Sequence, residues 1–247
     1  MASTNETGHI KQVANFLELI SFCQNYGADY QPSKSNMEVA AMSALHANAS
    51  ISLQNVIDKA TAFNMARNTR YDCFSNFKKF ATKLINAIAA TDASDKTVEN
   101  AKTINRKIQG TVAPGKSAAS NSGSTGSTPD DKTISSSQQS YDLMTQHFAR
   151  LIAILETEPA YAPREIDLQV ASLKNQLNNM LTANAAVAAT YPPVSSARIQ
   201  RDVLLYADKD SIYSIQADVK KYIKSVYGAL SPQYKQISNM VFINKRY

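Results

Sequence analysis

The chain has 247 residues and a mass of 27.0 kDa, 44% of its residues are hydrophobic, and its formal net charge is +6. The hydrophobic share is too high for a wholly disordered protein. The length exceeds a typical domain of roughly 100 to 150 residues, so two compact units are expected. With 7 glycines, 8 prolines and no tryptophan, but abundant Ala, Leu, Ile, Lys, Asn and Gln, the composition favours helices over sheets.

The first residues, MASTNETGHIKQ, lack the basic stretch and following apolar stretch that are typical of a secretory signal peptide. No apolar run approaches the roughly 18 residues that a membrane-spanning helix needs. A cytoplasmic protein is therefore expected. Cys23 and Cys73 fall within helical patterns, and in a reducing compartment we expect both to be buried free thiols.

Apolar residues recur at helical spacing in four segments of the first half of the chain. The first segment covers residues 9–26. A second, longer one begins just after Pro32 and continues past Ile57. The third covers 74–88, and the fourth covers 94–110, from a serine typical of an N-cap to a glycine typical of a helix end. The first half is therefore predicted to form four helices with short connections.

Residues 111–138 break this pattern, because they are rich in Ser, Gly, Thr, Ala and Asp and poor in large apolar side chains. That composition predicts a flexible linker. At its start, Gly110, Gly115, Lys116 and Ser117 satisfy the spacing of a phosphate-binding loop. Such a loop needs a strand before it and a helix after it, whereas here a helical pattern precedes it and the linker follows. No nucleotide or other cofactor is predicted.

Beyond the linker, the second half repeats the first at a constant offset of 131 residues. The segment YQPSKSNMEVAAM from residue 30 is matched by YAPREIDLQVASL from residue 161, and Ala-Arg-x-x-Arg at 66–70 is matched by the same pattern at 197–201. Further on, FKKF at 77 resembles VKKY at 219 only at a larger offset. The sequence thus indicates an internal duplication with an insertion before the third helix of the second copy.

In the second copy, Pro192-Pro193 is predicted to separate the second helix from the third, and Ser231-Pro232 to open the last helix. The predicted fold is all-α: a four-helix unit over 1–110, a flexible Ser/Gly-rich linker over 111–138 and a second four-helix unit over 139–247. An up-down-up-down bundle is the simplest packing for each unit. The pattern is compatible with two separate bundles and with one shared eight-helix core.

Signals of enzyme chemistry are missing from the sequence. His9, His46 and His147 fall on different predicted helices with no Cys or Glu at ligand spacing, so no metal site is predicted, and these side chains are expected on helix faces or in solvent. No nucleophile elbow occurs, and neither cysteine lies in a nucleophile motif. We therefore expect no catalytic residue, no small-molecule substrate and no enzymatic activity.

The positive charge is spread evenly over the chain. Residues 1–110 contain 12 Lys and Arg against 9 Asp and Glu, and residues 139–247 contain the same numbers. The third predicted helix of each copy carries three lysines that are candidates for contact with nucleic-acid phosphates: Lys78, Lys79, Lys83, Lys220, Lys221 and Lys224. The alternative is that these lysines form the solvent-exposed polar face of an amphipathic helix.

Tyr30 and Tyr161 each stand two residues before a proline at the start of the second helix of their copy. Proline disfavours helical conformation in the residue before it, so each motif should end the connection between the first two helices. The ring is expected to pack on the bundle end while the hydroxyl reaches solvent or a backbone partner. The alternative is that the two tyrosines contact a partner protein.

Three segments resemble an uncharacterised group of bacterial proteins: STNETGH at Ser3 to His9, ISSSQQSYD at Ile134 to Asp142 and SPQYKQIS at Ser231 to Ser238. The resemblance covers most of the chain. It implies a duplicated, tandem helical-bundle protein in a bacterial cytoplasm, and it implies no function.

Taken together, these features predict a non-enzymatic helical interaction or scaffold protein whose partner is another protein or a second copy of the chain. The alternative is a helical nucleic-acid-binding protein that uses the lysines of the third helix of each copy. Retention on DNA or RNA that weakens steeply with added salt would distinguish the second from the first.

Overall fold

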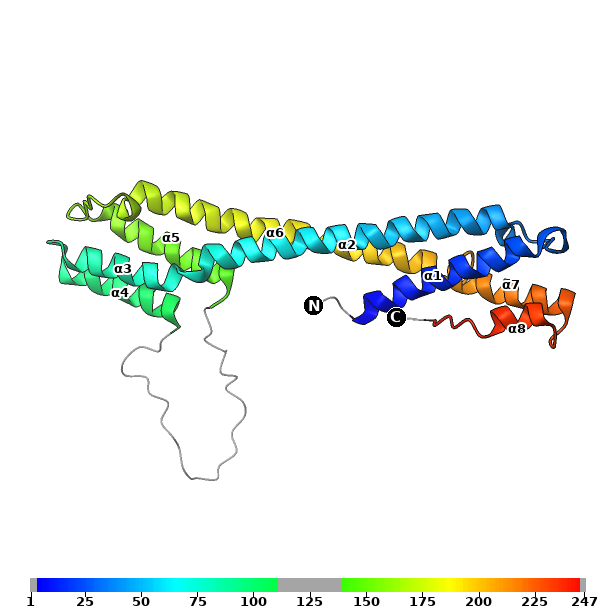
Figure 1. Ribbon diagram of the computed structural model, residues 1–247. Helices are drawn as coiled ribbons and strands as arrows, with labels where there is room; N and C mark the ends of the chain where they lie inside the picture. The colour runs from blue at the N-terminus through cyan, green and yellow to red at the C-terminus, as the bar shows by residue number, and fades with distance from the viewer. Residues whose placement is uncertain (1–3, 111–138, 245–247) are drawn as a thin grey trace, which may run out of the picture. The chain divides into compact units, whose positions relative to one another are not determined.

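The computed structural model of the protein describes residues 4–110 and 139–244 (Figure 1). These residues are all-α, as predicted, and contain no strand. The predicted linker 111–138 and the Lys116 motif lie outside them. The helices are α1 (Thr4–Asn25), α2 (Val39–Ser75), α3 (Phe77–Ala89), α4 (Asp95–Gln109), α5 (Tyr141–Thr157), α6 (Val170–Tyr206), α7 (Ile212–Tyr227) and α8 (Pro232–Ser238), with 3-10 turns η1 (Gly27–Asp29), η2 (Ser35–Met37) and η3 (Ile166–Leu168).

Several helix ends follow from local sequence. The hydroxyl oxygens of Ser94, Ser140 and Ser231 each accept a hydrogen bond from the backbone N–H three residues further on, which satisfies one of the unpaired amides of a first helical turn. Gly110 ends α4 at φ 79°, a left-handed conformation that favours glycine, and its N–H donates to the Arg106 carbonyl at 3.0 Å. The predicted bounds of α4 and the predicted start of α8 are confirmed.

Each copy contains four helices in the same order, with a 3-10 turn directly before the long second helix; η1 of the first copy has no counterpart in the second. The long helices α2 and α6 both have 37 residues, and the 3-10 turns η2 and η3 precede them at the same offset of 131. The third helices begin at Phe77 and Ile212, so the offset there is 135, because four more residues lie between α6 and α7 than between α2 and α3. The predicted insertion is confirmed, but the predicted match of FKKF with VKKY is wrong. At offset 135, four of the five buried positions of α3 coincide with buried positions of α7: Phe77, Ala81, Leu84 and Ile88 correspond to Ile212, Gln216, Val219 and Ile223.

The compact units of the structure do not coincide with the two copies. Unit 1 comprises Met1–Phe63 and Thr190–Tyr247, and unit 2 comprises Asn64–Ala189. Unit 1 therefore contains α1, α7 and α8, and unit 2 contains α3, α4 and α5, while α2 and α6 each give one end to each unit (Figure 1). The predicted boundaries 1–110 and 139–247 are corrected accordingly: each copy supplies half of both units, because its second helix continues from one unit into the other.

Each unit has its own hydrophobic core, built from both copies. In unit 1, α7 packs on α1 and α8, and in unit 2, α4 packs on α3 and α5. Fully buried side chains of the first core include Phe16, Leu19, Met42, Ile212, Val219 and Ile237, and those of the second include Phe77, Leu84, Ile88, Ile108, Phe148, Leu151 and Leu173. The fold thus has two shared cores, which differs from both packings that the sequence left open.

The predicted helix end at Pro192-Pro193 is wrong, because α6 continues through both prolines. A proline inside a helix removes one hydrogen bond and crowds the carbonyl four residues earlier, which costs about 3 kcal/mol. Both flanks are anchored: Met180 and Ala183 are buried before the prolines, and Val194 and Ala197 are buried after them. Burial of apolar side chains on both sides therefore holds the helix together across an unfavourable pair of residues.

The shared cores lead to a first prediction. Fragment 64–189 contains every buried residue of the second core, so it should fold alone as a helical monomer. Fragments 1–110 and 139–247 each lack half of both cores, so each alone should be unfolded or self-associated, and mixing them should restore cooperative unfolding. Circular dichroism melting and light scattering on each fragment and on the mixture measure this. Cooperative folding of monomeric 1–110 would contradict the division into units 1 and 2.

Candidate functional site

The repeated Tyr-x-Pro motifs make the same contact in both units. The Tyr30 hydroxyl donates to the Met37 carbonyl at 2.8 Å, and the Tyr161 hydroxyl donates to the Leu168 carbonyl at 2.8 Å. Each bond spans the connection before the long helix and closes it over seven residues. The prediction that the hydroxyl reaches a backbone partner is confirmed.

Both rings are buried, with 8% of Tyr30 and 7% of Tyr161 exposed. Burial raises the pKa of the Tyr30 hydroxyl above its ordinary value, and burial together with Asp167 and Glu165 raises the pKa of Tyr161 to about 12. A buried ring with a bonded hydroxyl presents little surface to another protein. The geometry therefore favours the structural interpretation of both residues over the partner-contact hypothesis.

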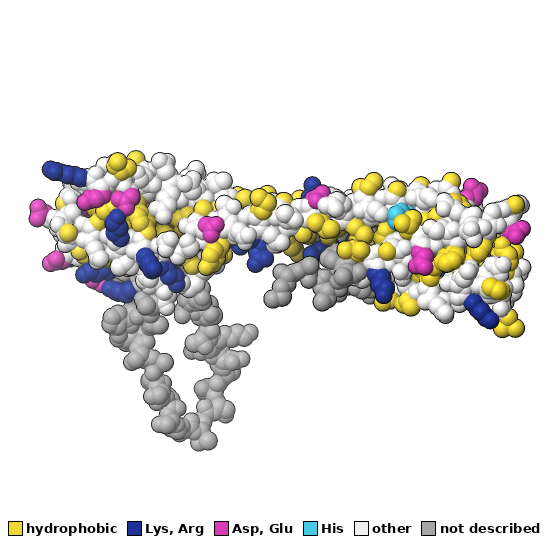
Figure 2. Space-filling view, viewed as in Figure 1, with side chains coloured by type: hydrophobic (Ala, Val, Ile, Leu, Met, Phe, Trp, Pro, Cys, Tyr) yellow, Lys and Arg dark blue, Asp and Glu magenta, His cyan; other side chains and the backbone are white. Residues whose placement is uncertain are grey.

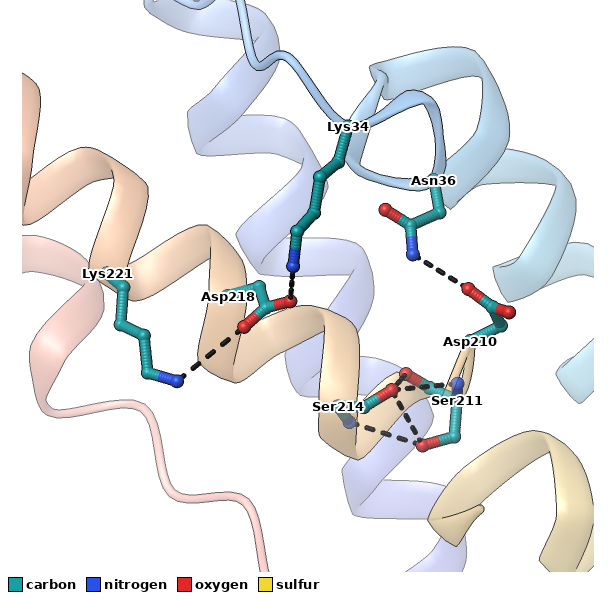
Figure 3. A network of polar contacts seen from close by, with 7 residues as sticks. All are labelled: Lys34, Asn36, Asp210, Ser211, Ser214, Asp218 and Lys221. Carbon is teal, nitrogen blue, oxygen red and sulfur yellow. Dashed lines mark hydrogen bonds and ion pairs between the residues drawn. The ribbon is translucent and has the colours of Figure 1, made fainter. Parts of the chain in front are cut away.

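A polar network in unit 1 joins the connection before α2 to the start of α7 (Figure 3). The Lys34 Nζ lies 2.6 Å from the Asp218 Oδ2, and the Asn36 Nδ2 donates to the Asp210 Oδ1 at 2.7 Å. Lys34 bonds Asp218 and lowers the pKa of its carboxyl. Next to these two contacts, the Ser211 side chain caps α7 by accepting a hydrogen bond from the Ser214 backbone N–H. Each of these groups has a partner within the network, so it fixes a loop rather than presenting a reactive group.

Unit 2 carries a similar ion pair with its charges exchanged, although its aspartate stands two residues beyond Glu165, the counterpart of Lys34 at offset 131. Lys83 on α3 lies 2.6 Å from the Asp167 Oδ2 in the connection before α6. Lys83 is equivalent to Asp218 at the offset of 135 that relates α3 to α7. In unit 1 the connection supplies the cation and the third helix the anion, whereas in unit 2 the roles are reversed.

The six candidate lysines are divided between the two units, and most have intramolecular partners. The Lys220 Nζ donates to the Met240 carbonyl at 2.6 Å and lies 5.3 Å from the centre of the Phe242 ring, and burial lowers its pKa. Lys78 donates to the Gln109 carbonyl, Lys83 and Lys221 pair with aspartates, and Lys224 lies over the Tyr234 ring. Among these six, Lys79 is the one with no such contact in the described part of the chain.

The histidines differ from expectation in their burial. His9 and His147 lie on the helices α1 and α5, as one of the two expectations had it, but they are 0% and 3% exposed, so the expected solvent exposure is wrong for these two. The His9 Nδ1 lies 2.6 Å from the Tyr206 hydroxyl, which ties α1 to the end of α6. Among the described residues, no group of three or more His, Cys, Asp or Glu side chains is arranged to hold a metal ion. Cys23 is a buried free thiol, as predicted, and its burial raises its pKa to about 11, while Cys73 is partly exposed.

An apolar hollow on unit 1 lies between α2 and α6, and we call it the α2–α6 groove. It has a volume of about 800 Å³. Its apolar lining is exposed: 69% of Ile51, 63% of Ile199 and 57% of Val203. Apolar side chains also cover much of the visible face of unit 1 in Figure 2. The full lining is Asn48, Ile51, Ser52, Gln54, Asn55, Asp58, Ile199, Gln200, Val203 and Leu204.

The sequence pattern did not predict this groove, because the groove lies between two helices from different copies. Ile57 falls on the apolar pattern of the second helix, and that pattern does not reveal that part of it faces solvent. The difference between the two copies could have indicated the groove. Ile51, Ile199 and Val203 are apolar, whereas their equivalents at offset 131 are the polar residues Thr182, Asn68 and Asp72.

Comparisons with known proteins add no relative: no family model, no curated protein and no solved structure matches the chain. Among the described residues, no helix is both long enough and apolar enough to cross a membrane.

The paired tyrosines generate the second prediction. Tyr30→Phe and Tyr161→Phe each remove a buried hydrogen bond to a carbonyl, so each should lower the free energy of unfolding by about 1 kcal/mol. The two losses should add, because the residues belong to different units. Urea unfolding measures both, and Tyr191→Phe, at an exposed ring, is the control that should change nothing. Unchanged stability in both variants would contradict a structural role of the hydroxyls.

His147 generates the third prediction. Burial, followed by Lys107 and Arg150, lowers the pKa of His147 below its ordinary value. The unfolded state then binds the proton at a higher pH than the folded state does, so the stability contributed by neutral His147 is complete above the unfolded-state pKa of about 6.5. It is lost as the pH falls through the folded-state pKa. Urea unfolding between pH 7.5 and 5 should therefore show a smaller decline for His147→Leu than for the unsubstituted protein; an equal decline would refute this assignment.

Proposed function

We propose that the protein is a non-enzymatic helical interaction protein that binds a helix of a partner protein in the α2–α6 groove. The observation that carries this proposal is the difference between the two copies at the groove. Three exposed apolar residues line it, and their equivalents in unit 2, which are also exposed, are polar. The two units use the same elements, so folding does not require apolar side chains at these positions. Exposed apolar patches that the fold does not need are typical of interaction sites.

The shape of the groove favours a helix as its occupant. Two helices, α2 and α6, form its walls, and an amphipathic helix can place its apolar stripe between them. The rim is mostly amides, from Asn48, Asn55 and Gln200, with one carboxylate, Asp58. A partner helix is therefore expected to carry large apolar residues at helical spacing and a basic residue opposite Asp58.

Nucleic-acid binding has less support than protein binding. Its candidate lysines are divided between the units, and five of the six hold carbonyls, carboxylates or aromatic rings of the chain itself. Release of these contacts would offset part of the gain from binding phosphates. Membership of the uncharacterised bacterial group and a cytoplasmic location remain part of the proposal, since both rest on the sequence.

The fourth prediction tests the groove by giving it the residues of the other copy. The triple variant Ile51→Thr, Ile199→Asn, Val203→Asp should fold with unchanged melting temperature, because the equivalent residues are already accommodated in unit 2. Capture of partners from cells of the source organism, followed by titration with a purified helix of the captured partner, should show at least a tenfold loss of affinity in this variant.

Leu230→Asp is the matched control, because Leu230 is 84% exposed in unit 1 and lies outside the groove. It should leave partner binding unchanged. A partner that binds the triple variant as tightly as the unsubstituted protein would refute the groove as the site. Concentration-dependent dimerisation that the triple variant abolishes would instead identify a second copy of this chain as the occupant, and salt-sensitive retention on DNA with no protein partner would overturn the proposal.

A further inference from the structure

A second hollow, in unit 2, lies beside Tyr161 and has a volume of about 520 Å³. We call it the Tyr161 pocket. This volume lies within the roughly 300 to 1,000 Å³ of sites for small molecules. Its lining combines α3, the connection before α6 and η3, and it consists of Lys83, Asn86, Ala87, Ala90, Thr91, Ala160, Tyr161, Ala162, Pro163, Arg164, Glu165 and Leu168.

The equivalent place in unit 1 contains a tyrosine side chain. The Tyr222 ring meets the Tyr30 ring edge to face, with centroids 5.4 Å apart and planes at 86°. The Tyr222 hydroxyl accepts a hydrogen bond from the Gln31 backbone N–H at 3.0 Å. One ring therefore makes an aromatic contact and a polar contact at the same time, and both contacts are favourable.

The groups that receive this ring in unit 1 have equivalents around the Tyr161 pocket. At offset 131, Tyr161 corresponds to Tyr30 and Ala162 to Gln31. The Tyr161 ring is held by its hydrogen bond to the Leu168 carbonyl, as the Tyr30 ring is held by Met37. The Ala162 N–H is bonded to no acceptor in the part of the chain that the structure describes. A tyrosine side chain that lines the pocket, with 7% of its surface exposed, and a backbone donor are thus both present.

The residue that differs is the one that supplies the ring. At the offset of 135 that relates α3 to α7, Ala87 corresponds to Tyr222. Ala87 belongs to the pocket lining, and its methyl group reaches neither the Tyr161 ring face nor the Ala162 amide as a tyrosine would. Unit 2 therefore has the receiving groups of an aromatic contact without the side chain that makes it in unit 1.

We propose that the Tyr161 pocket binds a phenol ring from outside the chain, in the place that Tyr222 takes in unit 1. The ring meets Tyr161 edge to face, and its hydroxyl oxygen accepts from the Ala162 N–H. Lys83, Asn86 and Thr91 add polar side chains to the lining of the pocket. The ring can belong to a small phenol or to a tyrosine side chain of a peptide, since both present the same chemistry.

The fifth prediction tests this site with p-cresol, the side chain of tyrosine as a free molecule. Titration of the full chain, followed by amide chemical shifts, should show saturable binding that shifts the amides of Ala87 and Ala162. Ala87→Tyr should weaken binding at least tenfold and raise the melting temperature, because the new side chain takes the place of the ligand. Toluene, which has the ring without the hydroxyl, should bind several-fold more weakly than p-cresol.

The reciprocal variant, Tyr222→Ala, should create a second p-cresol site in unit 1, seen as new shifts at the Gln31 amide; where this variant fails to fold, Ala87→Tyr decides alone. A Gly-Gly-Tyr-Gly-Gly peptide that binds at least as tightly as p-cresol identifies a tyrosine side chain as the ligand, and a peptide that binds more weakly identifies a small phenol. Absence of saturable p-cresol binding, or equal binding by Ala87→Tyr, would overturn the proposal.

Discussion

The structure depends on one constraint: the second helix of each copy begins in one unit and ends in the other. Residues 39–63 of α2 pack in unit 1, and the rest of the helix lies in unit 2, so the chain enters α3 and α4 in the other unit. The same holds for α6 in the opposite direction. Neither core can then be completed by one copy. This exchange of equivalent elements is the arrangement that domain swapping produces between two protomers, here realised between two copies in one chain.

Much of the secondary structure could be predicted from the sequence, because it is encoded locally. The cap at Ser94, the left-handed Gly110 and the two Tyr-x-Pro motifs each fix one end of an element through neighbouring atoms. The exchange could not be predicted in this way. Apolar periodicity shows which face of α3 is buried, but it does not show whether Phe77 packs on Phe16 of its own copy or on Phe148 of the other, as it does here with ring centroids 5.0 Å apart.

Tertiary burial also explains the other departures. The pair Pro192-Pro193 by itself indicates a helix end. In the fold, buried side chains on both sides of the pair keep α6 continuous. The local sequence around His9 indicates a polar surface residue. In the fold, the hydroxyl of Tyr206, 197 residues further along the chain, lies beside the His9 ring. The α2–α6 groove and the Tyr161 pocket could not be predicted from the sequence for a related reason. Each is lined by segments of both copies, which lie together only because the copies exchange elements.

Comparison of the two copies distinguishes positions at which the fold requires one residue from positions at which it accepts different residues. Both copies have a tyrosine at this position, Tyr30 and Tyr161, and each hydroxyl donates the same buried hydrogen bond to a backbone carbonyl, which indicates that the fold requires these tyrosines. The ion pairs Lys34–Asp218 and Lys83–Asp167 join the same two elements with the charges exchanged, from connection positions that differ by two residues. Pairing of a copy with another of its own kind would bring Lys34 toward Lys83, or Asp167 toward Asp218. Like charges at these partly exposed positions would cost at most about 1 kcal/mol per pair. This small repulsion favours the pairing of the first copy with the second over the pairing of a copy with its own kind. The scaffold therefore accepts different residues at corresponding positions of the two halves, and Ile51, Ile199, Val203 and Ala87 differ from their counterparts within the same fold.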